Sequence, residues 1–321
     1  MQSKERPRII FMGTPEFAVA SLDAIVQAGY PVVAVITAPD KPAGRGMQLN
    51  TSAVKKYALD KGLKILQPEK LKNPQFLEEL RALQADLQIV VAFRMLPELV
   101  WNMPPMGTVN LHGSLLPQYR GAAPINWAVI NGEKETGVTT FKLQQDIDTG
   151  NILLQESFPI GEKETAGEVH DKMKEIGARL VVRTIEGLAA GTLTEQPQPS
   201  NIELKHAPKI FTDTCRIDWT QPVENIYNLI RGLSPFPAAF TQLDGKLLKI
   251  YHAEKEITPP SHPPGPSPQP AGTPSHSPGG WDTDKKTYLR FAAADGYIHA
   301  TEVQLEGKKK MPVQDFLRGY K

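Results

Sequence analysis

Short apolar runs alternate with amphipathic stretches along the first 190 residues. The runs 8–12, 31–37 and 86–93 are apolar without polar alternation, a pattern typical of strands buried on both faces of a parallel sheet. A stretch with helical spacing separates the first two runs, so strand, helix and strand follow one another. This βαβ unit predicts an α/β fold, a Rossmann-like and mostly parallel sheet with helices on both faces.

Local signals set the limits of further elements. Helices are predicted at 52–61, 73–84 and 124–131, and strands at 108–112, 136–142 and 151–158. In the first helix Thr14 is the expected N-cap and Pro15 the first helical residue. Thr165 and Glu168 form a capping box that starts a long helix ending near Gly191.

The pattern changes in the C-terminal third. After a helix at 222–233, the Asp-Gly pairs at 244–245 and 295–296 each join two runs with strand character, which predicts hairpins in a small β-barrel. Between the hairpins, 259–280 holds 9 of the chain's 29 prolines and too few apolar residues to order itself. We therefore expect an α/β domain at 1–190, a linker at 191–209, and a barrel domain at 210–321 with a disordered insert at 259–280.

Composition adds limits. With 321 residues, 40% of them hydrophobic and 22% charged, the chain is typical of a soluble protein of about two domains. No apolar run approaches the roughly 20 residues of a membrane span, and the N-terminus lacks the apolar core of a signal peptide. Cys215 is the only cysteine, which excludes an intramolecular disulfide. A cytoplasmic location is the expectation.

Candidate chemistry gathers at the strand 108–112. Asn110 and His112 lie two apart and so share a face, at the carboxyl end of the strand where open α/β sheets bind ligands. Taken alone, such a pair is more often satisfied by backbone partners than catalytic. Asp148 in the Asp-Thr-Gly turn is placed to face His112, and the three together suit acyl transfer as oxyanion donor, proton carrier and orienting carboxylate.

Other chemistries fit less well. The turn after the first strand has Gly13 but neither further glycine of a dinucleotide fingerprint, and Glu16 would repel a phosphate there. The histidines lack zinc-ligand spacing, so no metal is expected. A Ser114–His112–Asp148 hydrolase triad is disfavoured, because no G-x-S-x-G elbow presents the serine.

Five stretches in this order carry a family resemblance. They are Phe11–Ala18 (FMGTPEFA), Pro39–Gly46 (PDKPAGRG), Asn110–Pro117 (NLHGSLLP), Tyr119–Ile125 (YRGAAPI) and Asp148–Gly150 (DTG). The chain resembles the methionyl-tRNA formyltransferases over nearly its whole length, through Arg216–Trp219 (RIDW) to the C-terminus. The Asn-His-Asp set alone would indicate only the wider group of folate-dependent formyltransferases and deformylases.

The resemblance implies transfer of a formyl group from 10-formyltetrahydrofolate to the α-amine of initiator methionyl-tRNA, with an OB-like C-terminal domain that contacts tRNA. It implies Asn110, His112 and Asp148 as the catalytic set. Asp148 would fix the tautomer of His112 and favour its imidazolium form. Folate contacts are expected from two stretches, Ser114, Leu115, Leu116 and Pro117, and Phe93, Arg94 and Met95. The second stretch replaces the usual Tyr-Gly pair of the family, and its Arg94 could change the rim of the pocket.

Charge gives little support for tRNA binding by itself. The formal net charge is +1, and residues 206–321 hold 14 Lys and Arg against 12 Asp and Glu, so binding must rest on clusters. The candidates are Lys41 and Arg45 in the loop 38–46, where the resemblance places the acceptor end, and Lys308, Lys309 and Lys310. The chain is expected to act as a monomer.

Two rival functions remain open. The first is a folate-dependent formyltransferase acting on a small amine, such as an amino sugar or a purine precursor. The second is a non-catalytic RNA-binding protein that kept an enzyme fold. The loop 38–46 and the appended barrel argue against the first, and the intact Asn110, His112 and Asp148 argue against the second.

Overall fold

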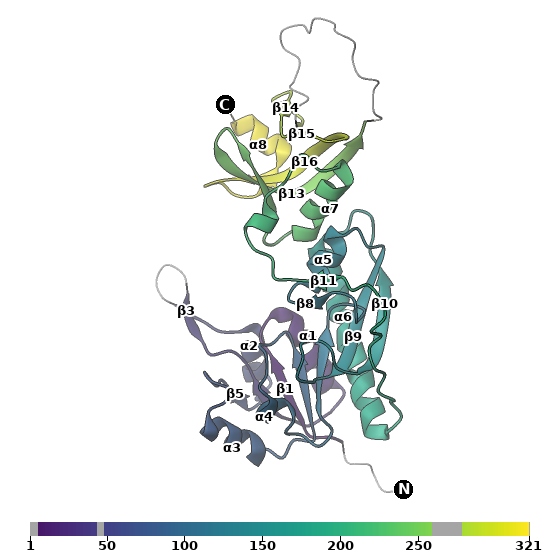
Figure 1. The fold of residues 1–321 in the computed structure, drawn as a ribbon. Coiled ribbons are helices and arrows are strands. Elements are labelled where there is room, and N and C mark those ends of the chain that lie inside the picture. The colour runs from purple at the N-terminus through teal and green to yellow at the C-terminus, as the bar shows by residue number, and fades with distance from the viewer. Residues whose placement is uncertain (1–5, 44–47, 259–277, 321) are drawn as a thin grey trace, which may run out of the picture. The chain divides into compact units, whose positions relative to one another are not determined.

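The computed structural model describes residues 6–43, 48–258 and 278–320, and the chain divides into two compact units (Figure 1). Unit 1 holds the described residues of Met1–Gly121, Glu135–Phe158 and His170–His206; unit 2 holds those of Ala122–Lys134, Pro159–Val169 and Ala207–Lys321. Unit 2 thus takes two segments from the N-terminal part of the sequence. The boundaries expected at 190 and 209 stay a prediction.

Unit 1 is built on a seven-stranded sheet of order β10-β9-β7-β6-β1-β2-β5. Neighbouring strands from β5 to β7 are parallel, whereas β9 runs antiparallel to β7. The strands are β1 (Ile9–Gly13), β2 (Val32–Ile36), β5 (Ile65–Leu66), β6 (Leu87–Val91), β7 (Thr108–His112), β9 (Glu135–Lys142) and β10 (Ile152–Pro159). The predicted fold class is confirmed.

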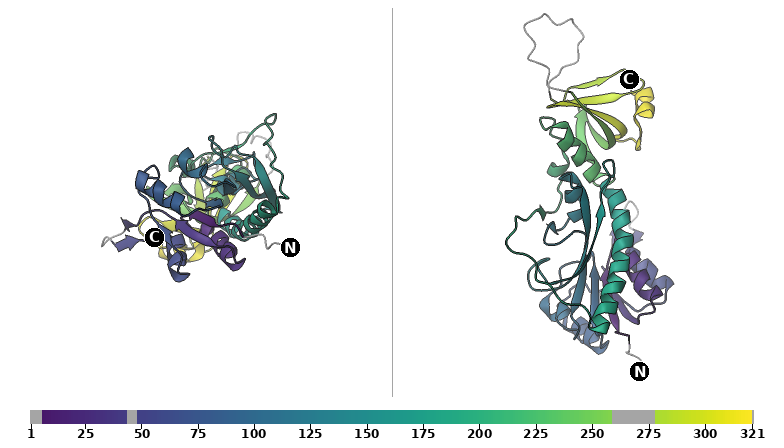
Figure 2. Two further views of the ribbon diagram at one scale, coloured as in Figure 1. Left: turned by 90° about the horizontal axis from the view of Figure 1, so that it is seen from below. Right: turned by 90° about the vertical axis from the view of Figure 1, so that its right-hand side faces the viewer.

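Helices cover both faces of this sheet. Successive side chains of a strand point to opposite faces, so both faces present apolar side chains that helices can bury. Ile10 and Met12 pack in one core cluster with residues of α3 (Pro74–Ala82) and α4 (Glu98–Trp101). On the other face α6 (Ala166–Ala190) lies so close to β7 that a Cβ on Gly177 would meet Leu111 at 2.8 Å. Figure 2 shows α6, the long teal helix, running beside the strands.

Element ends mostly follow the local signals. The Thr165–Glu168 capping box is confirmed, since Glu168 Oε2 accepts from the Thr165 amide at 2.8 Å. The N-cap predicted at Thr14 is wrong: the backbone is still extended at Pro15, which is itself the N-cap of α1 (Glu16–Gln27) and offers no side-chain hydrogen bond. The helix α2 (Ala53–Asp60) begins after Ser52, whose hydroxyl caps Lys55 N–H at 3.0 Å.

The segment expected to be a loop at 38–46 contains strand structure. β3 (Lys41–Ala43) and β4 (Gln48–Asn50) pair antiparallel on either side of residues 44–47, which lie outside the described part of the chain. The sequence did not predict these strands because three residues are too few to show a strand's alternation.

Unit 2 contains a six-stranded sheet in which β12-β13-β16-β15-β14 are neighbours and β17 pairs with β16. At the predicted type I′ turn, Asp244 and Gly245 have φ values of +48° and +76°, as that turn requires. The elements of unit 2 are α5 (Pro124–Ile130), the 3₁₀ turn Asp213–Cys215, α7 (Val223–Leu233), β12 (Ala239–Leu243), β13 (Lys246–Ile257), β14 (Trp281–Thr283), β15 (Leu289–Ala293), β16 (Gly296–Leu305), β17 (Met311–Pro312) and α8 (Val313–Gly319). Two further short strands pair with each other: β8 (Arg120–Gly121), which belongs to unit 1, and β11 (His206–Ala207).

Among the described residues, no helix is both long and apolar enough to cross a membrane.

Candidate active site

The strand β7 presents Asn110 and His112 on one face. Val109 and Leu111 point the other way and are buried at 0% and 4% exposure, which confirms the predicted alternation. Asn110 is half-buried, and no hydrogen-bond partner for its side-chain amide occurs within residues 6–43, 48–258 and 278–320. An amide that is accessible and unpaired can donate to a ligand at little cost.

His112 is held by a hydrogen bond at one ring nitrogen and by an aromatic contact of the ring. Its Nε2 lies 2.9 Å from the Tyr119 carbonyl oxygen, and the ring meets Phe141 edge-on at a centroid distance of 6.5 Å. A carbonyl oxygen only accepts, so Nε2 carries a hydrogen, and Nδ1 is the ring nitrogen left without a hydrogen bond among the described residues. The expectation that Asp148 fixes the tautomer is therefore wrong; the Tyr119 carbonyl does so.

Asp148 stands beside the free nitrogen of that ring. Its Oδ2 lies 3.8 Å from His112 Nδ1 and accepts a hydrogen bond from Gly121 N–H at 3.0 Å. At this distance the two groups form an ion pair only when the ring is protonated, and the atoms are too far apart for a hydrogen bond. Strand β7 and the loop between β9 and β10 thus bring together the His112 and Asp148 that the sequence suggested.

The loop carrying Asp148 is braced by residues that the sequence did not single out. Asp148 has φ = +54°, a left-handed conformation that Asp tolerates better than most residues. Gln198 Nε2 donates to the carbonyls of Asp148 and Gly150 at 2.8 Å each. Gln198 lies in a stretch without periodicity, so no local signal could have found it.

The buried surroundings of His112 are apolar. Leu116, Phe141 and Ile152 form one cluster, with exposed fractions of 8% or less. Such a setting strengthens electrostatic contacts of His112 and Asp148, because the local dielectric is lower than that of water. Across the described ranges, no group of three or more His, Cys, Asp or Glu side chains is placed to hold a metal ion.

The stretch 114–117, expected to meet the folate, turns most of its side chains inward. Ser114 is fully buried and donates to the Gln118 carbonyl at 2.6 Å, while Leu116 and Pro117 are buried and Leu115 is half-buried. The Thr139 hydroxyl holds this loop in place with two hydrogen bonds. It accepts from Leu116 N–H at 3.1 Å and donates to the Ser114 carbonyl at 2.7 Å. Of these four side chains, only that of Leu115 is not buried.

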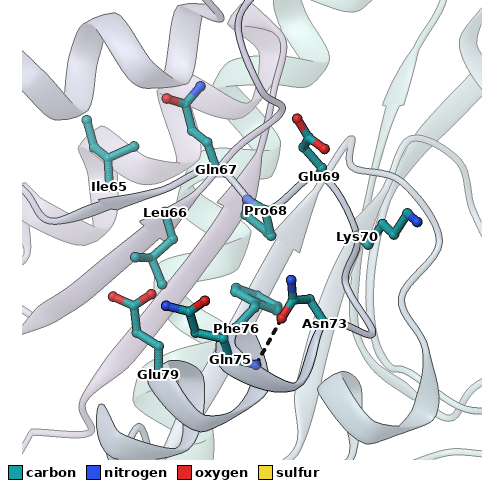
Figure 3. Close-up of a pocket in the computed structure, with 10 residues that line it drawn as sticks. All are labelled: Ile65, Leu66, Gln67, Pro68, Glu69, Lys70, Asn73, Gln75, Phe76 and Glu79. Atoms are coloured by element: carbon teal, nitrogen blue, oxygen red, sulfur yellow. Dashed lines mark hydrogen bonds between the residues drawn. The ribbon is translucent and has the colours of Figure 1, made fainter.

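The second expected folate stretch borders a pocket. Arg94 donates to the carbonyls of Pro68 and Glu69, the latter at 2.8 Å, and burial lowers the pKa of its guanidinium. Met95 is 71% exposed, whereas Phe93 is half-buried against the core. Pro68 and Glu69 line a pocket of about 550 Å³ between β5 and α3, shown in Figure 3, which none of Asn110, His112 and Asp148 lines. Arg94 therefore braces the wall of this pocket.

The lysines expected to contact tRNA are exposed where they are described. Lys41 is exposed on β3, whereas Arg45 lies outside the described residues. Lys308, Lys309 and Lys310 follow β16; of these, Lys310 pairs with Glu302 at 2.9 Å. Lys308 and Lys309 have no ion-pair partner within the described part of the chain.

Comparisons of sequence link the chain to known proteins along its whole length. The family model "Formyl transferase" matches residues 7–185, and the model "Formyl transferase, C-terminal domain" matches residues 209–321. A methionyl-tRNA formyltransferase of Parabacteroides distasonis is 56% identical over 99% of this chain and 97% of its own. One of Bacteroides fragilis is 51% identical over 99% and 96%.

Solved structures share the fold at low identity. An N-formyltransferase of Helicobacter canadensis, in complex with folinic acid and dTDP-3-aminofucose, has a TM-score of 0.67 and 21% identity over 92% of this chain and 98% of its own. HypX of Aquifex aeolicus, in complex with tetrahydrofolic acid, has a TM-score of 0.64 and 18% identity over 98% of this chain and 48% of its own. With a family model over each part of the sequence and half-identical relatives end to end, this chain belongs to the formyl transferase family.

Proposed function

We propose that this enzyme transfers the formyl group of 10-formyltetrahydrofolate to the α-amine of initiator methionyl-tRNA. The observation that carries the proposal is the amide of Asn110, unpaired among the described residues, beside a His112–Asp148 pair whose Nδ1–Oδ2 distance is 3.8 Å. The names of the half-identical relatives support this choice of acceptor. A cytoplasmic location and a monomeric state belong to the same proposal.

The reaction forms a carbon–nitrogen bond to the acceptor amine and breaks the one between the formyl carbon and the donor nitrogen. An α-amine has a pKa of about 7.7–8.0, so its reactive neutral form is accessible near neutral pH. As it attacks, negative charge develops on the formyl oxygen. The Asn110 amide stabilises that charge by donating a hydrogen bond, a role worth about 10²–10³ in rate in comparable oxyanion holes.

One proton must move from the acceptor amine to the departing nitrogen of the donor. His112 Nδ1 takes it, because the hydrogen on Nε2 is already donated to the Tyr119 carbonyl. The imidazolium that forms faces the Asp148 carboxylate, which stabilises its charge. Nδ1 then gives the proton to the departing nitrogen, and the ring returns to its starting state.

Recognition of the two substrates falls to different stretches. Backbone groups of 114–117, with Phe93, Arg94 and Met95, are proposed to meet the folate, and no metal takes part. For tRNA we propose contacts from Lys41, Arg45, Lys308, Lys309 and Lys310, whose ammonium and guanidinium groups can neutralise phosphates. Arg45→Ala should weaken use of tRNA while folate binding stays intact.

A single assay separates this function from its rivals. The protein is incubated with donor labelled in the formyl group and, in parallel, with charged initiator tRNA, charged elongator tRNA and free amines. Label in initiator tRNA alone supports the proposal. Label in an amino sugar or another small amine supports a formyltransferase of small acceptors, and tRNA binding without transfer supports a non-catalytic RNA-binding protein.

A further inference from the structure

The segment 195–205, expected to be part of a linker, lies along unit 1. Gln196 exchanges two backbone hydrogen bonds with Ile152, at 2.7 and 2.9 Å. Lys205 N–H donates to Gln118 Oε1 at 2.8 Å, and the Lys205 carbonyl accepts from Tyr119 N–H at 2.6 Å. The segment is therefore fastened near β10 at one end and beside the site at the other.

Between these two attachments, Gln198 points into the protein. It is half-buried although Pro197 and Pro199 on either side are exposed. Its amide donates to the carbonyls of Asp148 and Gly150 at 2.8 Å each, and its Oε1 accepts from Arg120 Nε at 3.1 Å and Nη2 at 2.6 Å. Gln198 thus uses both of its amide hydrogens and its oxygen, and each contact has good geometry.

These contacts converge on Asp148, the residue whose carboxylate faces His112. Arg120 orients Gln198, which fixes the backbone on both sides of Thr149, while the next residue, Gly121, donates directly to Asp148 Oδ2. The strand β8 therefore acts on Asp148 twice, once through its own N–H and once through Gln198. Without the two amide bonds, Asp148 would keep its left-handed conformation against fewer restraints.

We propose that Gln198, oriented by Arg120, is a positioning residue that holds the Asp148 carboxylate beside His112 Nδ1. Only the kinetic consequences of this inference rest on the proposed function. A positioning error of about 1 Å can cost on the order of 100-fold in rate.

The decisive variant is Gln198→Glu, which is nearly isosteric. It keeps an acceptor for Arg120 but places an oxygen against two carbonyls where the amide donated. We expect kcat for formyl transfer to fall about 10- to 100-fold, with little change in KM for either substrate. Gln196→Glu is the matched control, since it is the same substitution two residues away on an exposed side chain, and it should leave kcat unchanged.

A double-mutant cycle separates positioning from general support of the fold. If Gln198 acts through Asp148, adding Gln198→Glu to Asp148→Asn should cost little further rate in single turnover. If Gln198→Glu lowers the single-turnover rate by the same factor in the wild-type protein and in Asp148→Asn, the proposal is overturned. A merely structural role lowers activity whether or not the carboxylate is present.

Hydrogen exchange gives a readout that needs no catalysis. In Gln198→Glu, amides within 143–152 should exchange faster than in the wild-type protein or in Gln196→Glu, while those of β1 and β6 keep their rates. Unchanged exchange in 143–152 would also overturn the proposal. Should the wild-type protein transfer no formyl group, the proposed function alone fails, and the exchange measurement still decides the role of Gln198.

Discussion

At the residue scale, the site depends on the side chains of His112 and Asp148, each of which is constrained by its surroundings. The Nε2 hydrogen of His112 is donated to the Tyr119 carbonyl, so only Nδ1 faces the Asp148 carboxylate without a hydrogen bond. Asp148 holds a φ of +54°, which Asp and Asn adopt more readily than other residues with a side chain. Replacing Asp148 by Asn can therefore remove the charge while the backbone keeps its conformation.

Asp148→Asn should remove the charge and keep the backbone. We expect kcat to fall on the order of 10²–10⁴-fold, by analogy with carboxylates that support a catalytic imidazole, while the free energy of unfolding changes by less than about 0.5 kcal/mol. Single-turnover kinetics and urea unfolding measure the two effects. Asp148→Ala is the comparison variant and should also lose stability through backbone strain; an Asn variant with wild-type kcat would refute the assigned role.

At the element scale, the loop between β9 and β10 is fixed by a close approach of two backbones. A Cβ on Gly150 would lie 1.6 Å from the Lys142 carbonyl oxygen and 3.1 Å from Phe141. The loop can turn back on β9 only because residue 150 has no side chain. The position of Asp148, two residues earlier, follows from that turn.

Gly150→Ala should push the loop away from β9. Because the nearest atom is backbone and cannot move aside, we expect a loss of about 1–3 kcal/mol in the free energy of unfolding, together with a large loss of formyl transfer. Gly319→Ala is the control, since nothing lies within 4 Å of its added methyl group. Equal unfolding midpoints for the two variants in urea would show that the close approach is not a constraint.

The segment that carries Gln198 also contributes a pH-dependent contact. A hydrogen bond from the Lys142 ammonium, followed by one from Asn151, holds the pKa of the Glu195 carboxyl below its usual range. A lowered carboxyl pKa stabilises the fold above the unfolded value of about 4.3, and this contribution is lost as pH falls through the folded value.

Glu195→Gln should therefore lose less stability than the wild-type protein between pH 6 and pH 3. The difference should stay below about 1 kcal/mol, because the pair is partly exposed and screened by solvent. Chemical denaturation at a series of pH values measures it. Glu203→Gln, on the same segment and exposed, should follow the wild-type curve; a Glu195→Gln curve parallel to the wild type would exclude the contribution.

At the scale of the whole molecule, unit 2 combines the C-terminal third with residues 122–134 and 159–169. Asn126 donates to the Gly232 carbonyl at 2.8 Å, and buried Arg231 donates to the Glu164 carbonyl at 3.0 Å. The two contacts join residues that lie 106 and 67 positions apart in the sequence. The formal net charge is only +1, so a polyanion has to bind at local clusters of basic side chains.

Lys308 and Lys309 are the clearest such cluster in unit 2. If both contact phosphates, the double variant Lys308→Ala/Lys309→Ala should weaken tRNA binding and lower the slope of log affinity against log salt by about 2. Lys310→Ala should change the slope less, because Lys310 already pairs with Glu302. Binding measured over a series of salt concentrations tests this, and an unaltered slope in the double variant would remove these lysines from the interface.

Much of the fold could be predicted, because its signals are local. The strand Thr108–His112, the Thr165–Glu168 capping box and the turn at Asp244–Gly245 each depend on residues within a few positions of one another. The features that the sequence analysis did not predict correctly also have local causes. β5 has only two residues, β3 and β4 have three each, and Pro15 occupies the N-cap position expected for Thr14.

The sequence by itself determined the α/β class, the face shared by Asn110 and His112, and the family resemblance, because period, turn chemistry and motif order are properties of neighbouring residues. Tertiary structure alone decided which nitrogen of His112 is free and what braces Asp148. Those answers come from Tyr119, Gln198 and Arg120, through hydrogen bonds that join residues as many as 78 positions apart. Which groups meet across such separations is fixed only when the chain has packed.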